Sequence, residues 1–83
     1  MTRLSCLVPF CRRTTAPGRF AEWICAKHWR LVAPDTKARR RAADRLVRKA
    51  KVRQHRALPA LEWRAARAWE ACKREAIEKA FGI

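Results

Sequence analysis

Three cysteines and one histidine lie within 23 residues near the start of this 83-residue chain, and they constrain its fold more than any other feature. They form two closely spaced pairs, Cys6-x4-Cys11 and Cys25-x2-His28, which thirteen residues separate. Sulfur and nitrogen ligands in such pairs are typical of tetrahedral zinc sites, where Cys3His is a recognised set. We therefore predict one structural Zn²⁺ ion bound by Cys6, Cys11, Cys25 and His28.

Other interpretations of these cysteines explain the pattern less well. Buried thiols beside an unrelated histidine would leave the paired spacing without a cause. A disulfide would use two of the three cysteines, leave the third unpaired and give His28 no role. Disulfides are also rare in reducing compartments. A redox pair would need a Cys-x-x-Cys spacing, which the sequence lacks. Catalytic zinc keeps a coordination position open for water, whereas four protein ligands close the shell.

The residues around the two ligand pairs predict the local fold. Pro9 favours a turn inside the first pair, and the second pair, three residues apart, fits the first turn of a helix. Between the pairs, Pro17 and Gly18 form a turn signal between "RRTT" and "RFAEW", both compatible with short strands. A knuckle, a β-hairpin and a helix in this order predict a treble-clef-like zinc-finger module over residues 1–34.

Two prolines, Pro34 and Pro59, divide the rest of the chain into two predicted helices, about 36–56 and about 60–81. The expected architecture is an antiparallel helical hairpin over residues 35–83, packed with the zinc module as one domain. A single long kinked helix is the alternative. The predicted fold class is thus small, zinc-stabilised and mainly α.

Capping residues and apolar periodicity support these two helices. Asp35 is suited to cap the first helix at its N-terminus, and Gly82 is suited to end the second. Apolar residues recur at helical spacing in both. In the first helix they are Ala42, Ala43, Leu46, Val47, Ala50 and Ala57, and in the second Leu61, Ala65, Ala68, Trp69, Cys72, Ala76 and Ala80. We expect Cys72 to be a core residue, because free cysteine behaves as a small hydrophobic side chain.

The net charge of +14 arises from 21 basic and 7 acidic side chains. Residues 34–58 hold ten of the basic and only two of the acidic side chains. So large a positive charge favours a polyanionic partner, either nucleic acid or an anionic membrane. The membrane is the weaker candidate, because the apolar face of the first helix is mostly alanine, whereas interfacial helices bury larger side chains.

The predicted nucleic-acid contacts lie on this basic segment, opposite its alanine-rich face. Side chains there could neutralise several phosphates, and arginine could also reach guanine edges if the helix enters a major groove. We expect a nucleic-acid partner, DNA more than RNA. The alternative is a solvated helix face without a partner, although such faces usually mix charge signs. The candidate residues are Arg39, Arg40, Arg41, Arg45, Arg48, Lys49, Lys51, Arg53 and Arg56.

The aromatic residues divide between the zinc module and the last helix. We expect Trp23 and Trp29 to cover the zinc site, packing with Phe10 or Phe20. Trp63, together with Ile77 and Phe81, marks a second apolar side of the last helix, which could bind a protein partner or a second copy of the chain. We expect Trp63 itself to be a core residue against the zinc module or to contact another copy of the chain, and stacking on a nucleic-acid base is the alternative.

The sequence contains no recognisable set of catalytic residues. Residues 12–24 contain no histidine that could serve a nuclease hairpin, and the few carboxylates form no acidic metal pair. His55 is expected to be solvated or to contact a phosphate. No membrane or small-molecule partner is expected. The first ten residues lack the apolar stretch of a secretory signal, so we expect a cytoplasmic location.

The ligand spacing with "KHW", followed by an Arg-rich helix and "AWEACKREAIEKA", resembles small zinc-finger proteins of bacteriophages and prophages. The first third also resembles zinc modules associated with phage HNH-type endonucleases. The resemblance implies zinc bound by the four ligands and a role in a bacterial host cell, but the missing hairpin histidine departs from the nuclease pattern. We therefore expect a non-enzymatic nucleic-acid-binding protein. The alternative is a small protein-interaction factor that modulates a host or phage enzyme.

Overall fold

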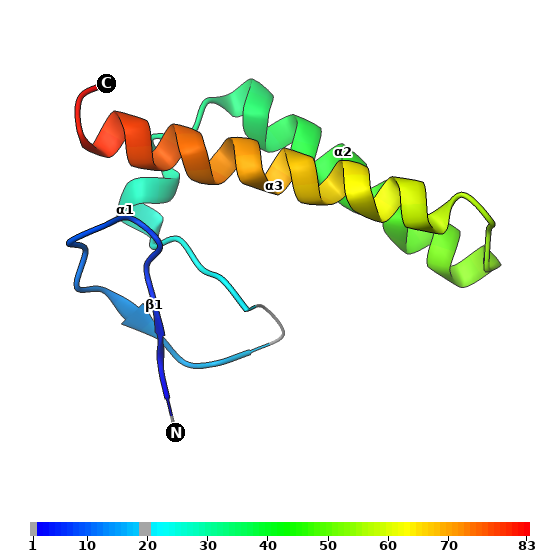
Figure 1. The fold of residues 1–83 in the computed structure, drawn as a ribbon, viewed down its shortest axis with the longest axis horizontal. Helices are drawn as coiled ribbons and strands as arrows, with labels where there is room; N and C mark the ends of the chain where they lie inside the picture. The colour runs from blue at the N-terminus through cyan, green and yellow to red at the C-terminus, as the bar shows by residue number, and fades with distance from the viewer. Residues whose placement is uncertain (1, 19–20) are drawn as a thin grey trace. The chain divides into compact units, whose positions relative to one another are not determined.

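The computed structural model describes residues 2–18 and 21–83, which form two short strands and three helices (Figure 1). The chain divides into two compact units. The first unit comprises residues 1–32 and 73–83, and the second comprises residues 33–72. The C-terminal eleven residues thus belong with the cysteine-rich segment, whereas the boundary predicted from the sequence lay near residue 34.

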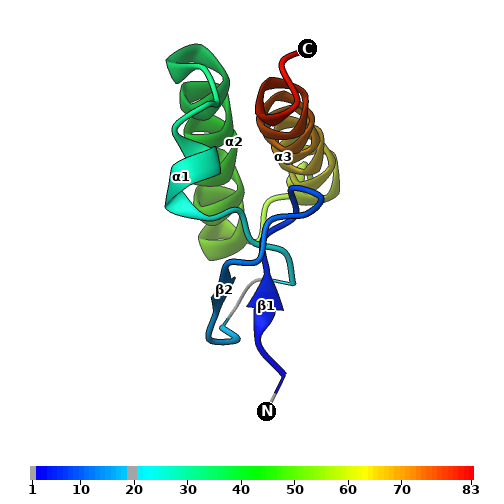
Figure 2. The ribbon, with the colours of Figure 1, turned by 90° about the vertical axis from the view of Figure 1, so that its left-hand side faces the viewer.

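The first unit contains a two-stranded antiparallel sheet of β1 (Leu4–Ser5) and β2 (Thr14–Thr15), which lie side by side in Figure 2. The pairing brings Leu4 opposite Thr15 and Ser5 opposite Thr14. Cys6 continues the pattern, since its N–H donates to the carbonyl of Arg13 at 3.0 Å. The sheet therefore ends where the first metal-ligand candidate begins.

The prediction of a hairpin between "RRTT" and "RFAEW" was wrong in its pairing. Thr14–Thr15 pairs with the segment before Cys6, and residues 21–23 form no strand. Trp23 makes an isolated parallel bridge to Cys6, and its carbonyl accepts from the N–H of Leu7 at 3.0 Å. Arg19 and Phe20, within the expected second strand, lie outside the described residues. The segment around Cys6 therefore pairs on both of its edges.

A four-residue helix, α1 (Ala26–Trp29), follows Cys25, as the spacing of the second ligand pair predicted. Among the described residues of this unit, the buried ones are Cys6, Val8, Ile24, Cys25, Val32 and Ala76. In the same unit, Lys73 donates to both carboxylate oxygens of Glu22 at 3.0 and 3.2 Å. The Lys73 side chain is only 15% exposed, so this ion pair is worth more than an ordinary surface pair.

The second unit pairs α2 (Pro34–Arg53) with the first part of α3 (Leu58–Ala80), as Figure 1 shows. Thr36 lies near the start of α2, and its carbonyl lies 3.8 Å from the Sγ of Cys72. Because early residues of α2 meet later residues of α3, the two helices are antiparallel within this unit. A helical hairpin is therefore formed, and not a single kinked helix.

The core of the second unit is small. Ala43, Ala50 and Cys72 are buried, as their positions on the apolar faces predicted. Leu46 was assigned to the same apolar face, yet it is 41% exposed. Alanine at the contact positions lets the helix backbones approach closely, and the larger Leu46 then lies at the margin of the interface.

The helix ends differ from the predicted ones for identifiable reasons. α2 begins with Pro34 at its first position and Ala33 at the N-cap, so the prediction that Asp35 is the N-cap was wrong. Proline is favoured at a first helical position because it lacks the N–H that would remain unsatisfied there. Asp35 instead lies in the first turn, where a carboxylate interacts favourably with the helix dipole.

Both long helices end in the same hydrogen-bonding motif. At the end of α3, Gly82 has φ 76°, and the N–H of Ile83 donates to the carbonyl of Glu78 at 2.9 Å. This is a Schellman motif, as expected for a glycine that follows a helix. At the end of α2, the left-handed position is occupied by Gln54, with φ 50°.

Candidate metal centre and basic helix

The four predicted ligands meet in the first unit, where their ligand atoms all lie within 4.8 Å of one another. The Sγ atoms of Cys11 and Cys25 are 3.9 Å apart, and the Nδ1 of His28 lies 3.6 Å from the Sγ of Cys6. Tetrahedral zinc requires sulfur–sulfur separations of about 3.8 Å and sulfur–nitrogen separations of about 3.5 Å. The cluster is thus close enough to hold a metal ion.

Local backbone structure positions each of these ligands. Cys25 occupies the N-cap of α1 and His28 lies in its first turn, so both side chains share one face of the helix. Their ligand atoms are 3.2 Å apart. The N–H of Cys25 lies 3.3 Å from the Sγ of Cys6 and donates to it. A backbone donor of this kind stabilises a thiolate and orients it toward a metal.

The knuckle between Cys6 and Cys11 contains a left-handed residue. The N–H of Cys11 donates to the carbonyl of Val8 at 3.1 Å, which closes a tight turn. Phe10 occupies the turn with φ 69°. The turn directs Cys11 back toward the cluster, at the cost of a backbone conformation that an aromatic residue seldom adopts.

The protonation of the thiols depends on their surroundings. Burial raises the pKa of the Cys6 thiol above its usual value. Burial acts in the same direction on Cys25, but the nearby backbone N–H of His28 and the neighbouring thiols outweigh it and lower the pKa. A metal ion must therefore displace a proton from Cys6, so its affinity falls as the pH falls.

All four cysteines are free thiols. The 3.9 Å between the Sγ atoms of Cys11 and Cys25 is far longer than a sulfur–sulfur bond. Cys72, by contrast, is fully buried among the helices of the second unit, away from the other three cysteines in sequence. Its role is packing, as the sequence analysis expected.

Eight of the nine predicted nucleic-acid contacts are exposed. They follow α2 and the turn after it, and within the described residues none of the eight has an ion-pair partner. Nucleic-acid binding by these residues stays a prediction. The exposed residues are Arg39, Arg41, Arg45, Arg48, Lys49, Lys51, Arg53 and Arg56.

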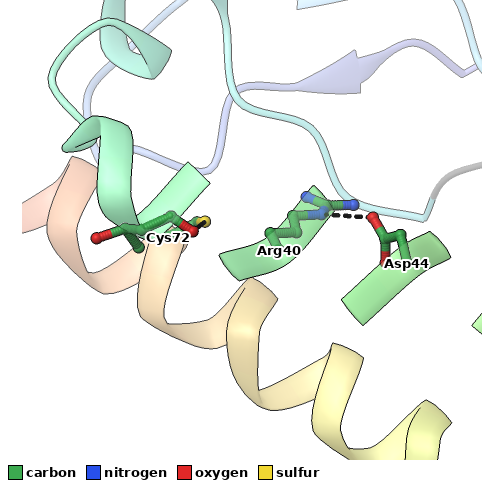
Figure 3. A network of polar contacts seen from close by, with 4 residues as sticks. Arg40, Asp44 and Cys72 are labelled. Atoms are coloured by element: carbon green, nitrogen blue, oxygen red, sulfur yellow. Dashed lines mark hydrogen bonds and ion pairs between the residues drawn. The ribbon is translucent and has the colours of Figure 1, made fainter. Parts of the chain in front are cut away.

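Arg40 differs from the other eight basic residues. Its guanidinium lies 4.1 Å from the centroid of the Trp69 ring. Its Nε donates to the Oδ2 of Asp44 at 3.3 Å, as Figure 3 shows. The Arg40 side chain is only 25% exposed. The geometry thus gives Arg40 a part in joining α2 to α3, for which the sequence offered no signal.

The second histidine also has a structural contact. The Nδ1 of His55 accepts a hydrogen bond from the N–H of Ala57 at 3.0 Å, within the turn between α2 and α3. His55 itself is exposed. Its expected contact with a phosphate stays a prediction.

The aromatic residues near the cluster are arranged differently from what was predicted. Trp23 and Trp29 are half-buried in the first unit. Either Phe10 or Phe20 was expected to pack with them over the metal site, but Phe10 is 92% exposed. The left-handed turn at Phe10 sends its side chain outward, which sequence reasoning missed. Phe20 lies outside the described residues.

Trp63 is 64% exposed in the second unit, so the expected core position was wrong, whereas the expected contact with another copy of the chain stays a prediction. The guanidinium of Arg67 lies 4.8 Å from the centroid of its ring. This cation–π contact covers part of one ring face.

No family model matches the chain, and no characterised protein or solved structure is significantly similar to it. The resemblance to small phage zinc-finger proteins therefore stays a prediction. Within residues 2–18 and 21–83, no helix is both long and apolar enough to cross a membrane.

Proposed function

We propose that the Cys3His cluster holds one structural Zn²⁺ ion in a treble-clef-like finger. Three thiolates and one imidazole favour zinc, and their separations suit a tetrahedral ion. The order of the knuckle, the sheet and α1 supports the treble-clef comparison, although β2 pairs with a strand before the knuckle. Elemental analysis of the purified protein tests this proposal: one zinc per chain is expected, and its loss in His28→Ala identifies the site.

We further propose that the chain is a nucleic-acid-binding protein, with DNA favoured over RNA. The observation that carries this proposal is the exposed basic surface of α2. Eight cationic side chains of α2 and the turn after it have no ion-pair partner among the described residues, so they repel one another, and a row of phosphates would relieve that repulsion. The neighbouring carboxylate of Asp44 is already paired with Arg40.

A salt titration tests this proposal directly. The affinity for duplex DNA, duplex RNA and single strands is measured by fluorescence anisotropy at several salt concentrations. The logarithm of the affinity should fall linearly with the logarithm of the salt concentration, with a slope of about −0.9 for each phosphate neutralised. An absence of binding to every one of these nucleic acids at low salt would contradict the proposal.

We propose that the protein acts without catalysing a reaction. Four protein ligands would fill the coordination shell of the metal, and His55 faces a backbone N–H in a turn. Incubation with plasmid DNA and Mg²⁺ or Mn²⁺ tests this proposal. Cleavage that disappears in His55→Ala would overturn it.

A protein-interaction factor is the second candidate function, and Trp63 favours it. A tryptophan that is 64% exposed is unusual on a small surface, and such residues often anchor protein interfaces. Capture from nuclease-treated lysate separates the two functions, because a protein partner should survive the loss of nucleic acid. The same partner should then be lost with Trp63→Ala.

A further inference from the structure

Phe10 and Phe81 form an exposed aromatic pair in the first unit, beside the metal-ligand cluster. Their rings meet edge to face, with centroids 6.4 Å apart and an interplanar angle of 83°. Phe10 is 92% exposed and Phe81 is 49% exposed. Rings this exposed add little to the core, so the stability of the fold does not explain them.

The backbone holds Phe10 in this position despite its strain. Phe10 has φ 69°, in the left-handed region that glycine or asparagine would occupy at lower cost. The next residue is Cys11, so the turn that brings this ligand to the cluster also presents the Phe10 ring to solvent. Strain at an exposed aromatic residue indicates a functional role more than a packing role.

Positive side chains surround the same two rings. A groove of about 310 Å³ is lined by Phe10 and Phe81 together with Arg12, Arg13 and Lys27. Among the described residues that line it, none carries a carboxylate. Zinc with three thiolates and a neutral imidazole would add a charge of about −1 beside the groove, which the three cations exceed. The groove thus favours an anionic ligand with an aromatic or apolar part.

We propose that this groove binds one nucleotide of a single-stranded nucleic acid. The base stacks on the open face of Phe10, while Arg12, Arg13 and Lys27 hold the adjacent phosphates. The base faces of a duplex are covered by their neighbours, so a duplex cannot make the same contact. This inference rests on the proposed nucleic-acid binding, but its residues are separate from the basic residues of α2.

The test compares single-stranded and duplex binding in the zinc-loaded full chain. The probes are a labelled oligothymidylate of about 12 nucleotides and a duplex of the same length. Phe10→Gly removes the ring and also suits the left-handed backbone, so the fold should be kept. We expect it to weaken single-strand binding about tenfold or more, while duplex binding changes less than about twofold.

Two control variants separate stacking from general effects. Phe10→Trp keeps an aromatic ring and should retain single-strand binding. Val52→Ala removes an apolar side chain that is 86% exposed on α2, and should change neither affinity. If Phe10→Gly loses zinc or its thermal midpoint falls, Phe10→Leu serves in its place, because leucine keeps the bulk but cannot stack. An oligouridylate probe distinguishes RNA from DNA as the source of the strand.

Each outcome decides the proposal. Single-strand affinity that is unchanged in Phe10→Gly overturns it and favours a protein ligand for the two rings. Equal losses for the single strand and the duplex also overturn it, since stacking should affect the single strand selectively. If Arg48→Ala weakens binding and Phe10→Gly does not, the proposed groove site is wrong, but the proposed nucleic-acid binding through α2 stands. If the unaltered protein binds no nucleic acid, both the proposed groove site and the proposed nucleic-acid-binding function are contradicted.

Discussion

The guanidinium of Arg40 lies 4.1 Å from the centroid of the Trp69 ring, so a cation of α2 packs on an aromatic residue of α3. The same guanidinium is fixed by Asp44 at 3.3 Å, one helical turn further along α2. Partial burial strengthens both interactions, because water screens them less. Arg40 therefore contributes to the stability of the helical hairpin.

We expect Arg40→Ala to destabilise the protein by about 1–2 kcal/mol, through loss of the cation–π contact and the ion pair. Arg39→Ala is the matched control: it removes an exposed charge next to Arg40 and should change stability by less than about 0.5 kcal/mol. Urea unfolding followed by circular dichroism measures both. Arg40→Lys should recover only part of the loss, because an ammonium lacks the planar face that stacks on Trp69. Equal effects of the two alanine variants would contradict this assignment.

Nothing in the sequence separates Arg40 from its neighbours. Arg39, Arg40 and Arg41 are consecutive, and only the rotation of α2 against α3 decides which of them meets Trp69. Helical periodicity placed the buried Ala43, Ala50 and Ala76 on the apolar faces, although it placed the exposed Ala42 and Ala80 there as well. It could not identify an arginine at the edge of the contact, where a long side chain reaches either solvent or a neighbouring ring.

Gln54→Gly should stabilise the protein. Gln54 occupies the left-handed position of the Schellman motif that ends α2, where the N–H of His55 donates to the carbonyl of Ala50 at 2.9 Å. Glycine adopts φ 50° without the steric cost that a Cβ imposes, which should add about 0.5–1 kcal/mol of stability. Thermal unfolding measures the gain. Gln54→Ala keeps the Cβ, so it should show no such gain, and a glycine variant of lower stability would refute the argument.

The helices were more predictable than the strands. Proline signals and apolar periodicity located both long helices to within a few residues, since each pattern extends over several turns. The two strands have only two residues each, so alternation could not reveal them. Their pairing joins Leu4–Ser5 to Thr14–Thr15 across the knuckle, a contact that "RRTT" alone does not encode.

Metal removal should expose three thiols together and leave the fourth protected. In the zinc-loaded protein, Cys6, Cys11 and Cys25 would be ligands, and Cys72 is fully buried. A thiol reagent should therefore react slowly before chelation. After chelation, three thiols should react fast and one slowly. Cys72→Ala should abolish the slow phase alone, and four equally fast thiols would show that the second unit has opened as well.

The affinity for zinc should decrease as the pH falls. Burial raises the pKa of Cys6, so its thiol keeps its proton at neutral pH and releases it when the metal binds. Each proton released makes the affinity fall up to about tenfold per pH unit. Competition with a chelator of known affinity, corrected for its own protonation, measures this at about pH 6 and about pH 8. An affinity that is independent of pH would mean that the thiols are ionised before the metal arrives.

The candidate metal cluster was predictable from the spacing of its residues, but the surface beside it was not. Each pair is brought together by a local turn, so the short spacing within the pairs was enough to predict that Cys6, Cys11, Cys25 and His28 lie together. Phe10 and Phe81 are 71 positions apart in the sequence, and they meet only because residues 73–83 belong to the first unit. The positive φ at Phe10 could not be predicted from the sequence, because glycine, the residue that usually indicates such a conformation, is absent there.

Arg48→Ala should weaken nucleic-acid binding without affecting stability, the reverse of what we expect for Arg40→Ala. Arg48 is exposed on α2, and loss of one phosphate contact should reduce the slope of log affinity against log salt by about 0.9. Arg40→Ala, whose cation already packs on Trp69, should leave that slope nearly unchanged. Measuring both variants at several salt concentrations, below the unfolding temperature of each, separates binding from folding. Identical slopes for Arg48→Ala and the unaltered protein would remove Arg48 from the interface.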